Sequence, residues 1–385
     1  MPELDGVLFN LSRGDFQNNG ASPWYTELGF GTPPQRLKVN IDSGTDITWL
    51  TSTLCPPESC QHTSGGRFDY RASSTFSFTD CLQRPFSFGA WGTMQVEAGQ
   101  DVVELPDPAG TRSMQLFFSA DYAGSQFAQL DWDGGIGLPS SSAYVEGRTS
   151  FLLQLLMESR TVRLPFVSFD TDYRSRQGTC QIGGVDPSKY DPTSSVFLPW
   201  KVYDVYPGSE YLWGADLYRL MVGDVEIAPG TPKVFATDSG SSQFKGDDDI
   251  MNAILTQIAR QGSPPVRLEL YGGRITVTPD MYNVYIEAGP DAGKTIPQFQ
   301  GLGMSQLVLV GSVLMDYCYT VFRYDVHICS PGALSLSPVG VYFFNKIGGP
   351  QIISGRPVEF PTRIPAHKGR GAFGREIPFE RGWEF

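Results

Sequence analysis

The sequence predicts a mostly β protein of two lobes, and three observations support this prediction. The chain has 385 residues, more than a single hydrophobic core usually serves, so two lobes are expected. Its 43 Gly, 29 Pro and 13% aromatic residues surround short β-branched runs, which is typical of strands joined by turns. The triplet Asp-Ser-Gly occurs twice, at Asp42 and at Asp238, each time directly after an apolar run. Together these features indicate two related halves with one carboxylate each.

The first half is predicted to contain a strand that ends at Asp42. Residues 37–41 are largely apolar, which suits a buried strand, and Gly44 permits the turn that follows. Residues 132–138 form another apolar run, interrupted by glycine. A glycine inside a strand commonly marks a close approach of two backbones, so this run is expected beside the loop at Asp42. Recurring leucines predict a short helix over 150–158.

The second half repeats this order. Residues 233–237 lead into Asp238, and the later apolar run 307–314 again contains a glycine. Between them, isoleucines at four-residue spacing predict a helix over 248–260. The three consecutive acids 247–249 stand directly before this pattern. Acids there favour a helix N-terminus, an interpretation we prefer to a cation site.

Hydroxyl residues accompany both carboxylates, namely Ser43 and Thr45 in the first triplet and Ser239 and Ser241 in the second. A carboxylate removed from water must be hydrogen-bonded, or it takes up a proton. A single Asp-Ser-Gly is more often a surface turn. The repetition of its surroundings favours a pair of carboxylates that meet and act as an acid and a base.

Several motifs in this order resemble the pepsin-like aspartic peptidases, a bilobal family with one catalytic Asp per lobe. The similarity runs from about Tyr25 to about Phe343. It is carried by four segments, residues 25–35, 67–76, 181–186 and 311–322, together with the two triplets. The resemblance implies two related β lobes of six-stranded type, with a central cleft and short helices. It divides the chain into an N-terminal lobe (1–190), a C-terminal lobe (191–345) and a C-terminal extension (346–385), expected as a tail or surface strap.

The resemblance implies that Asp42 and Asp238 are catalytic. Two carboxylates within hydrogen-bonding reach cannot both ionise easily, so the pair holds one proton over a wide acidic range. The ionised member acts as general base on a water, and the protonated member hydrogen-bonds to the scissile carbonyl. The residues that match supporting positions are Ser43, Gly44, Thr45, Ser239, Gly240 and Ser241.

Within this supporting set, two pairs of hydroxyl residues have different expected roles. Ser43 and Ser239 keep the hydroxyl of the commoner Thr, so hydrogen bonds between the lobes are expected beneath the dyad. Thr45 and Ser241 match the positions that bind the outer carboxylate oxygens.

The flap, the hairpin that covers substrate in this family, departs from the usual pattern. It corresponds to residues 86–103, and Trp49 stands where the family keeps a Trp beneath it. Phe88 or Trp91 occupies the place of the usual Tyr, and neither carries a hydroxyl. Either one of them simply covers the cleft, or catalysis is slowed or restricted to a narrow range of substrates. The flap and cleft residues are Trp49, Phe88, Gly89, Trp91, Gly92 and Thr93.

The pair Cys55 and Cys60 has the spacing of a disulfide that the family often carries, so the resemblance implies that they are bonded. His62 nearby suggests zinc, but a zinc site needs about four ligands and only these three cluster. We therefore expect no metal, and no motif points to a cofactor.

The four other cysteines are harder to assign. Cys318 and Cys329 offer a second bridge, while Cys81 and Cys180 have no partner that the sequence can identify. The expected disulfide favours an oxidising compartment. The sequence as written shows no signal peptide or prosegment, which favours the cytoplasm. A secreted or periplasmic protein is expected instead if a leading segment has been removed.

Charge and hydropathy exclude some functions. A net charge of -12 with no basic stripe argues against nucleic acid as a ligand. No apolar stretch is long enough to span a membrane. A monomer that acts on peptides or proteins is expected.

Three functions follow from these observations. The first is an aspartic endopeptidase that prefers bulky hydrophobic residues around the scissile bond. The second is an enzyme of the same fold that applies its acid/base pair to a small molecule, in a cyclisation or rearrangement. The third is a non-catalytic binding protein, which the intact carboxylates and hydroxyls disfavour.

Overall fold

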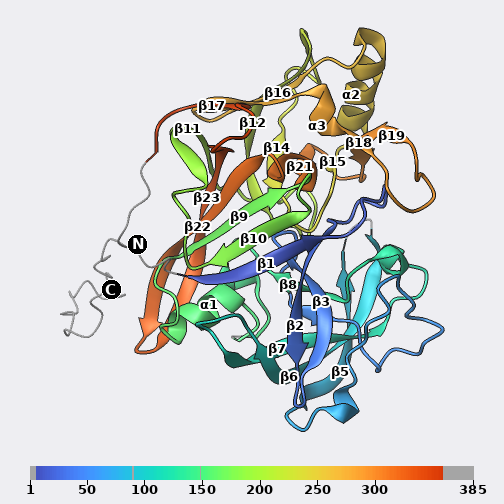
Figure 1. Ribbon diagram of the computed structural model, residues 1–385, viewed down its shortest axis with the longest axis vertical. Helices are drawn as coiled ribbons and strands as arrows, with labels where there is room; N and C mark the ends of the chain where they lie inside the picture. Colours follow the sequence, from blue (N-terminus) through green and yellow to red (C-terminus); the bar gives the residue numbers. More distant parts are fainter. Residues whose placement is uncertain (1–5, 89–90, 148, 359–385) are drawn as a thin grey trace.

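The computed structural model describes residues 6–88, 91–147 and 149–358, and two large sheets dominate it (Figure 1). The first sheet has thirteen strands in the order β11-β23-β22-β9-β10-β1-β2-β3-β8-β4-β7-β6-β5. Their bounds are β1 (Val7–Arg13), β2 (Trp24–Phe30), β3 (Gln35–Asp42), β4 (Trp49–Leu50), β5 (Ser77–Ser87), β6 (Thr93–Glu104), β7 (Thr111–Asp121), β8 (Gly134–Gly137), β9 (Phe166–Asp172), β10 (Gln177–Ile182), β11 (Tyr190–Pro199), β22 (Cys318–Ser330) and β23 (Ala333–Lys346).

The second sheet has nine strands and follows the order β20-β15-β21-β14-β12-β16-β17-β24, with β13 paired to β12. Its strands are β12 (Trp213–Val222), β13 (Val225–Glu226), β14 (Val234–Thr237), β15 (Phe244–Gly246), β16 (Val266–Leu270), β17 (Gly273–Val277), β20 (Phe299–Gly301), β21 (Leu307–Val310) and β24 (Ile353–Ser354). A separate pair consists of β18 (Asn283–Tyr285) and β19 (Thr295–Pro297). The predicted mostly β, bilobal fold class is confirmed.

The two halves repeat one local arrangement. In the first, β3 runs parallel to β8, which also pairs antiparallel with β4. In the second, β14 runs parallel to β21, which also pairs antiparallel with β15. The glycines in these runs lie where two backbones meet: a Cβ on Gly137 would approach the Ile47 carbonyl oxygen to 2.6 Å, and one on Gly311 would collide with the Ser241 carbonyl. The strands predicted to lie beside the Asp loops therefore do so.

Strands from both halves of the chain combine behind the two Asp loops. β22 pairs with β9, and β23 pairs with both β22 and β11. In Figure 1, β9, β10, β22 and β23 lie side by side across the middle of the molecule. Both sheets have more than the six strands expected, and in the first sheet this shared platform supplies several of the additional strands.

The two predicted helices are present as α1 (Leu152–Glu158) and α2 (Asp248–Gln261), and two short ones, α3 (Pro279–Tyr282) and α4 (Ser312–Met315), accompany them. The Asp247 side chain accepts hydrogen bonds from the backbone N–H groups of Asp249 and Ile250. Gly262 then ends α2 in the left-handed conformation, at φ 70°. The acidic run thus caps this helix, as we inferred from its position.

The expected disulfide forms, and the second pairing that the sequence left open does not form among the described cysteines. Cys55 and Cys60 are bonded, with their Cα atoms 5.9 Å apart. A disulfide between Cys318 and Cys329 is not formed, because both residues lie on β22, one at its start and one near its end. Eleven residue-to-residue steps along an extended strand place their Cα atoms roughly 35 Å apart, whereas a disulfide needs Cα atoms within about 7 Å.

The described part of the segment after Lys346 packs on the body of the protein. β24 pairs with β17, and the buried Ile353 lies within that short strand. Further on, the Ser195 N–H donates to the carbonyl of Arg356. None of the described residues from 347 to 358 lines the cleft described below.

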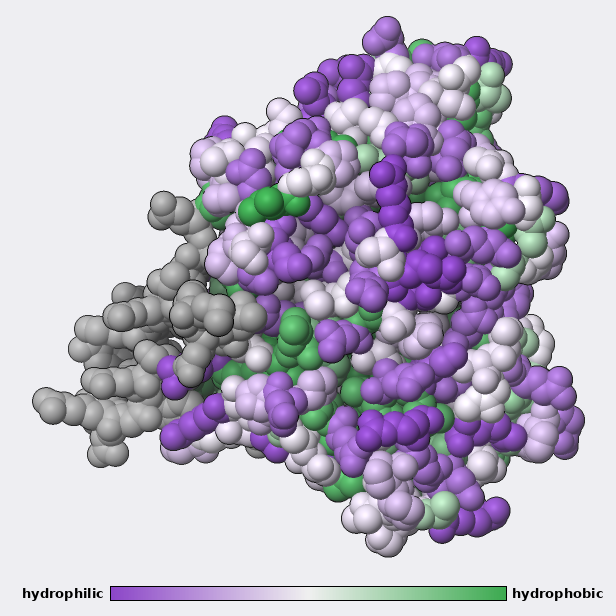
Figure 2. Space-filling model, in the orientation of Figure 1, coloured by the Kyte–Doolittle hydropathy of each residue, from purple (hydrophilic) through white to green (hydrophobic). Residues whose placement is uncertain are grey.

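Hydrophilic side chains cover most of the described surface on the face shown in Figure 2. Within the described ranges, no helix combines the length and the apolar character needed to cross a membrane.

Candidate active site

The two Asp-Ser-Gly loops meet between the lobes. Asp42 is the last residue of β3, and Asp238 directly follows β14. A Cβ on Gly44 would collide with the Asp238 carboxylate, and a Cβ on Gly240 would collide with that of Asp42. Each loop therefore needs glycine because the opposite carboxylate occupies the space that a side chain would fill.

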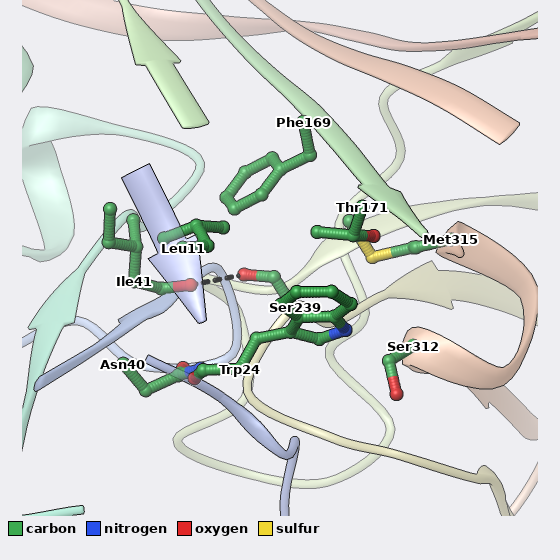
Figure 3. A pocket seen from close by; sticks show the side chains of 9 residues that line it. All are labelled: Leu11, Trp24, Asn40, Ile41, Phe169, Thr171, Ser239, Ser312 and Met315. Atoms are coloured by element: carbon green, nitrogen blue, oxygen red, sulfur yellow. Dashed lines mark hydrogen bonds between the residues drawn. The ribbon is translucent and has the colours of Figure 1, made fainter. Parts of the chain in front are cut away.

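Two serines hold the loops together through reciprocal hydrogen bonds. The Ser43 N–H donates to Ser239 Oγ at 2.9 Å, and the Ser239 N–H donates to Ser43 Oγ at 3.0 Å. Each hydroxyl in turn donates to a carbonyl of the opposite strand, Ser43 to Thr237 at 3.2 Å and Ser239 to Ile41 at 2.7 Å. Figure 3 shows the Ser239 hydroxyl directed at that Ile41 oxygen, beside a small cavity behind the dyad. All four bonds cross between the halves of the chain.

The carboxylates receive unequal hydrogen bonding. Asp238 accepts from the Gly240 N–H at 2.8 Å and from Ser241 Oγ at 2.7 Å. Asp42 accepts from the Gly44 N–H at 2.7 Å. Thr45, expected to bind the outer oxygen of Asp42, instead accepts a 3.5 Å bond from the Ile47 N–H. Ser241 therefore makes the hydrogen bond to a catalytic carboxylate that was expected of it, whereas the Thr45 hydroxyl binds a backbone N–H instead.

The environment of Asp42 favours its neutral form. Burial and the neighbouring Asp238 carboxylate raise the pKa of Asp42 well above its usual range. The Gly44 N–H and the Lys245 ammonium act in the opposite direction and are weaker. One proton is therefore retained at this pair under conditions in which an exposed aspartate is ionised.

The flap is the hairpin of β5 and β6, and an aromatic contact joins it to the residue beneath. The Phe88 ring meets Trp49 edge-on, with centroids 5.8 Å apart, and lies 5.0 Å from Phe127. A backbone bond from the Phe88 N–H to the Gly92 carbonyl closes the described part of the turn. Gly89 lies outside the described residues, and Thr93 begins β6 with an exposed side chain. Phe88 therefore covers Trp49 through apolar packing.

The cleft that contains both carboxylates is lined mainly by aromatic and apolar side chains. From the first half they are Trp49, Phe88, Trp91, Phe127, Leu130 and Trp132, and from the second Tyr206, Tyr211, Leu212, Leu302, Met304 and Leu309. Such walls favour ligands with large hydrophobic groups.

Three ionisable residues near the dyad were missed from the sequence. Lys245 lines the cleft, seven residues after Asp238, just as Trp49 follows Asp42 by seven. Burial raises the pKa of Asp46 to about 6. Burial and the charge of Asp46 together raise the pKa of Tyr211. Of these three, only Lys245 could have been found from the sequence, because it follows Asp238 at the same seven-residue distance at which Trp49 follows Asp42.

The three residues that suggested zinc, Cys55, Cys60 and His62, have other partners in the structure. The sulfurs of Cys55 and Cys60 are bonded to each other. The His62 side chain is buried and lies 2.9 Å from the carboxylate of Asp133 and 3.1 Å from the hydroxyl of Tyr122. These contacts make His62 part of a buried hydrogen-bond network.

Comparison with known proteins agrees with this geometry. Residues 23–330 match the family model described as eukaryotic aspartyl protease. The chain is 26% identical over 318 residues to chymosin of Bos taurus, covering 78% of each protein. It is 26% identical to cathepsin E-B of Xenopus laevis, covering 78% of this chain and 76% of the relative. A probable vacuolar protease A of Trichophyton verrucosum is 25% identical, with 78% and 75% covered. The chain belongs to the eukaryotic aspartyl protease family.

Proposed function

We propose that this protein is an aspartic endopeptidase that hydrolyses peptide bonds with a water activated between Asp42 and Asp238. The observation that supports it best is the set of reciprocal serine hydrogen bonds, which bring two buried carboxylates from separate halves into contact. A pair that shares one proton supplies an acid and a base together.

The unequal hydrogen bonding suggests separate roles for the two carboxylates. Asp238 receives two hydrogen bonds that stabilise its ionised form, so we assign it the role of general base toward water. Asp42, whose pKa is raised, holds the proton and donates it toward the scissile carbonyl. Attack by water passes the proton of that water to Asp238, and the leaving amine is subsequently protonated from the dyad. No covalent intermediate with the protein is needed.

The substrate class follows from the cleft walls. The first half of the chain contributes the aromatic rings of Trp49, Phe88 and Phe127 to the cleft, and the second half contributes Leu302 and Met304. Burying large apolar side chains there supplies binding free energy, at about 25 cal/mol per Å² removed from water. We therefore propose that bulky hydrophobic residues flank the bond that is cleaved.

A peptide library digested between pH 3 and pH 6 tests the proposal. Wild-type protein is expected to cleave between bulky hydrophobic residues, and pepstatin is expected to inhibit it. Asp42→Asn and Asp238→Asn should each lower kcat/KM by at least about 1,000-fold, because each removes one half of the acid/base pair. Folded variants that cleave at the wild-type rate would refute the assignment. A wild-type protein that cleaves no peptide would favour the alternative, an acid/base reaction on a small molecule.

A further inference from the structure

Lys245 is a buried lysine in the wall of the cleft for which the proposed mechanism has no role. It lies on β15 and is 2% exposed. Its ammonium donates hydrogen bonds to the Gly20 carbonyl and, at 3.3 Å, to Ser241 Oγ. The ring of Trp91, from the flap turn, lies over it at 5.7 Å from the ring centroid. Lys245 thus connects the flap, residues near Gly20 and the second Asp loop.

The charge of Lys245 has no carboxylate partner at ion-pair distance among the described residues. Several exposed lysines do pair with a carboxylate, for example Lys201 with Asp216 and Lys294 with Asp291. Lys245 has two neutral acceptors for the three N–H donors of an ammonium. A buried cation is costly to desolvate, and a carboxylate in direct contact with it offsets that cost. Although burial lowers the pKa of Lys245 to about 8, it stays a cation throughout the acidic range.

The position of Lys245 relative to the dyad defines where it meets a substrate. Ser241 Oγ donates to Asp238 at 2.7 Å and accepts from Lys245 at 3.3 Å. The ammonium therefore lies within about 6 Å of the Asp238 carboxylate, well within the range of a strong Coulomb interaction. An extended peptide advances about 3.3 Å per residue. A side chain about two residues from the scissile bond would therefore reach this site.

We propose that Lys245 is a specificity-determining residue that binds the carboxylate of a Glu or Asp side chain, about two residues from the cleaved bond. The inference rests on the proposed endopeptidase function and identifies one element of its substrate. The substrate carboxylate accepts an N–H of Lys245 and supplies the direct ion-pair partner that Lys245 lacks among the described residues, since Asp238 is joined to it through Ser241 Oγ. It replaces the face of Trp91, which is a weaker partner for a cation than a full negative charge.

Matched peptides test this inference. A hydrophobic scissile pair is kept constant while a single Glu, or Gln as its neutral match, is moved through four positions on each side. At pH 5.5, where Glu is ionised, wild-type kcat/KM should favour Glu over Gln by about tenfold or more at the second position on one side. Lys245→Met should bring that ratio close to one while the Gln peptides are still cleaved. Lys245→Arg, which keeps the charge, should retain the preference.

Lys189 provides a matched control. It is half exposed and pairs with Asp170 away from the cleft, so Lys189→Met should leave the Glu/Gln ratio unchanged. A wild-type protein that cleaves the Gln peptides but prefers Glu at none of the positions would overturn the inference and leave the endopeptidase proposal intact. An equal fall in kcat/KM for the Glu and Gln peptides in Lys245→Met would also overturn the inference. Lys245 would then have only a structural role, in which it joins Gly20 to Ser241 through hydrogen bonds.

Binding separates the two proposals if no peptide is cleaved. Calorimetry with the Asp42→Asn variant should then show about tenfold tighter binding of the Glu peptide, dependent on Lys245. Equal binding of the Glu and Gln peptides refutes the role of Lys245, whereas failure to cleave refutes the endopeptidase proposal.

Discussion

Replacing Ser43 with Ala should destabilise the protein by removing half of the reciprocal hydrogen bonding between the Asp loops. Ser43 is fully buried, and its hydroxyl accepts from the Ser239 N–H and donates to the Thr237 carbonyl. The substitution leaves both backbone groups without this partner. Each unsatisfied buried group costs about 1–3 kcal/mol, so the two groups together should lower the free energy of unfolding by about 2–6 kcal/mol.

The measurement is the midpoint of thermal unfolding at pH 5, which should fall by roughly 5 °C. Ser140→Ala is the matched control, because Ser140 is also fully buried but its hydroxyl has no hydrogen-bond partner among the described residues. That control should change the midpoint little. Ser239→Ala should resemble Ser43→Ala, since its hydroxyl serves the Ser43 N–H and the Ile41 carbonyl in the same way. If Ser43→Ala melts within a degree of Ser140→Ala, these bonds do not hold the loops together.

Two further predictions concern the site and its support. Gly240→Ala should lower kcat/KM for peptide cleavage by at least about 100-fold, because its Cβ would displace the Asp42 carboxylate. The control is Gly14→Ala, whose Cβ would meet nothing nearer than 3.6 Å and which should leave peptide cleavage unchanged. Equal activity of the two variants would contradict this account. Burial raises the pKa of Asp316 to about 6, above its unfolded value of 3.8, so its contribution to stability is present below about pH 4 and lost as pH rises through 6. Between pH 4 and pH 7, the free energy of unfolding should therefore fall less in Asp316→Asn than in wild type, and the difference should reach up to about 3 kcal/mol. Melting curves with the same pH dependence in both proteins would show the reasoning to be wrong.

The local pattern of the sequence predicted much of the fold. Apolar runs that end at Asp42 and Asp238 formed the strands β3 and β14. The spacing of isoleucines located α2, and the acids before it formed its cap. These features were predictable because burial of an apolar run and capping of a helix depend on neighbours within a few residues.

The site was only partly predictable, because its contacts join residues far apart in the chain. Sequence alone indicated that hydroxyls should support two carboxylates, but Thr45 turned to the Ile47 N–H. The pairing of Cys318 with Cys329 failed because one continuous strand holds both. Nothing near Lys245 in the sequence shows that Gly20 and Trp91 surround its ammonium.

By itself the sequence determined that two Asp-Ser-Gly loops, each following a buried strand, lie in two related halves of a mostly β chain. It also determined that Phe88 and Trp91 are the aromatic residues available at the flap turn. The tertiary structure decided that Phe88 packs on Trp49 and that a buried cation stands beside the dyad. The physical reason is that strand formation depends on short-range hydrophobic pattern, whereas the electrostatics of a cleft depend on which distant groups fold against it.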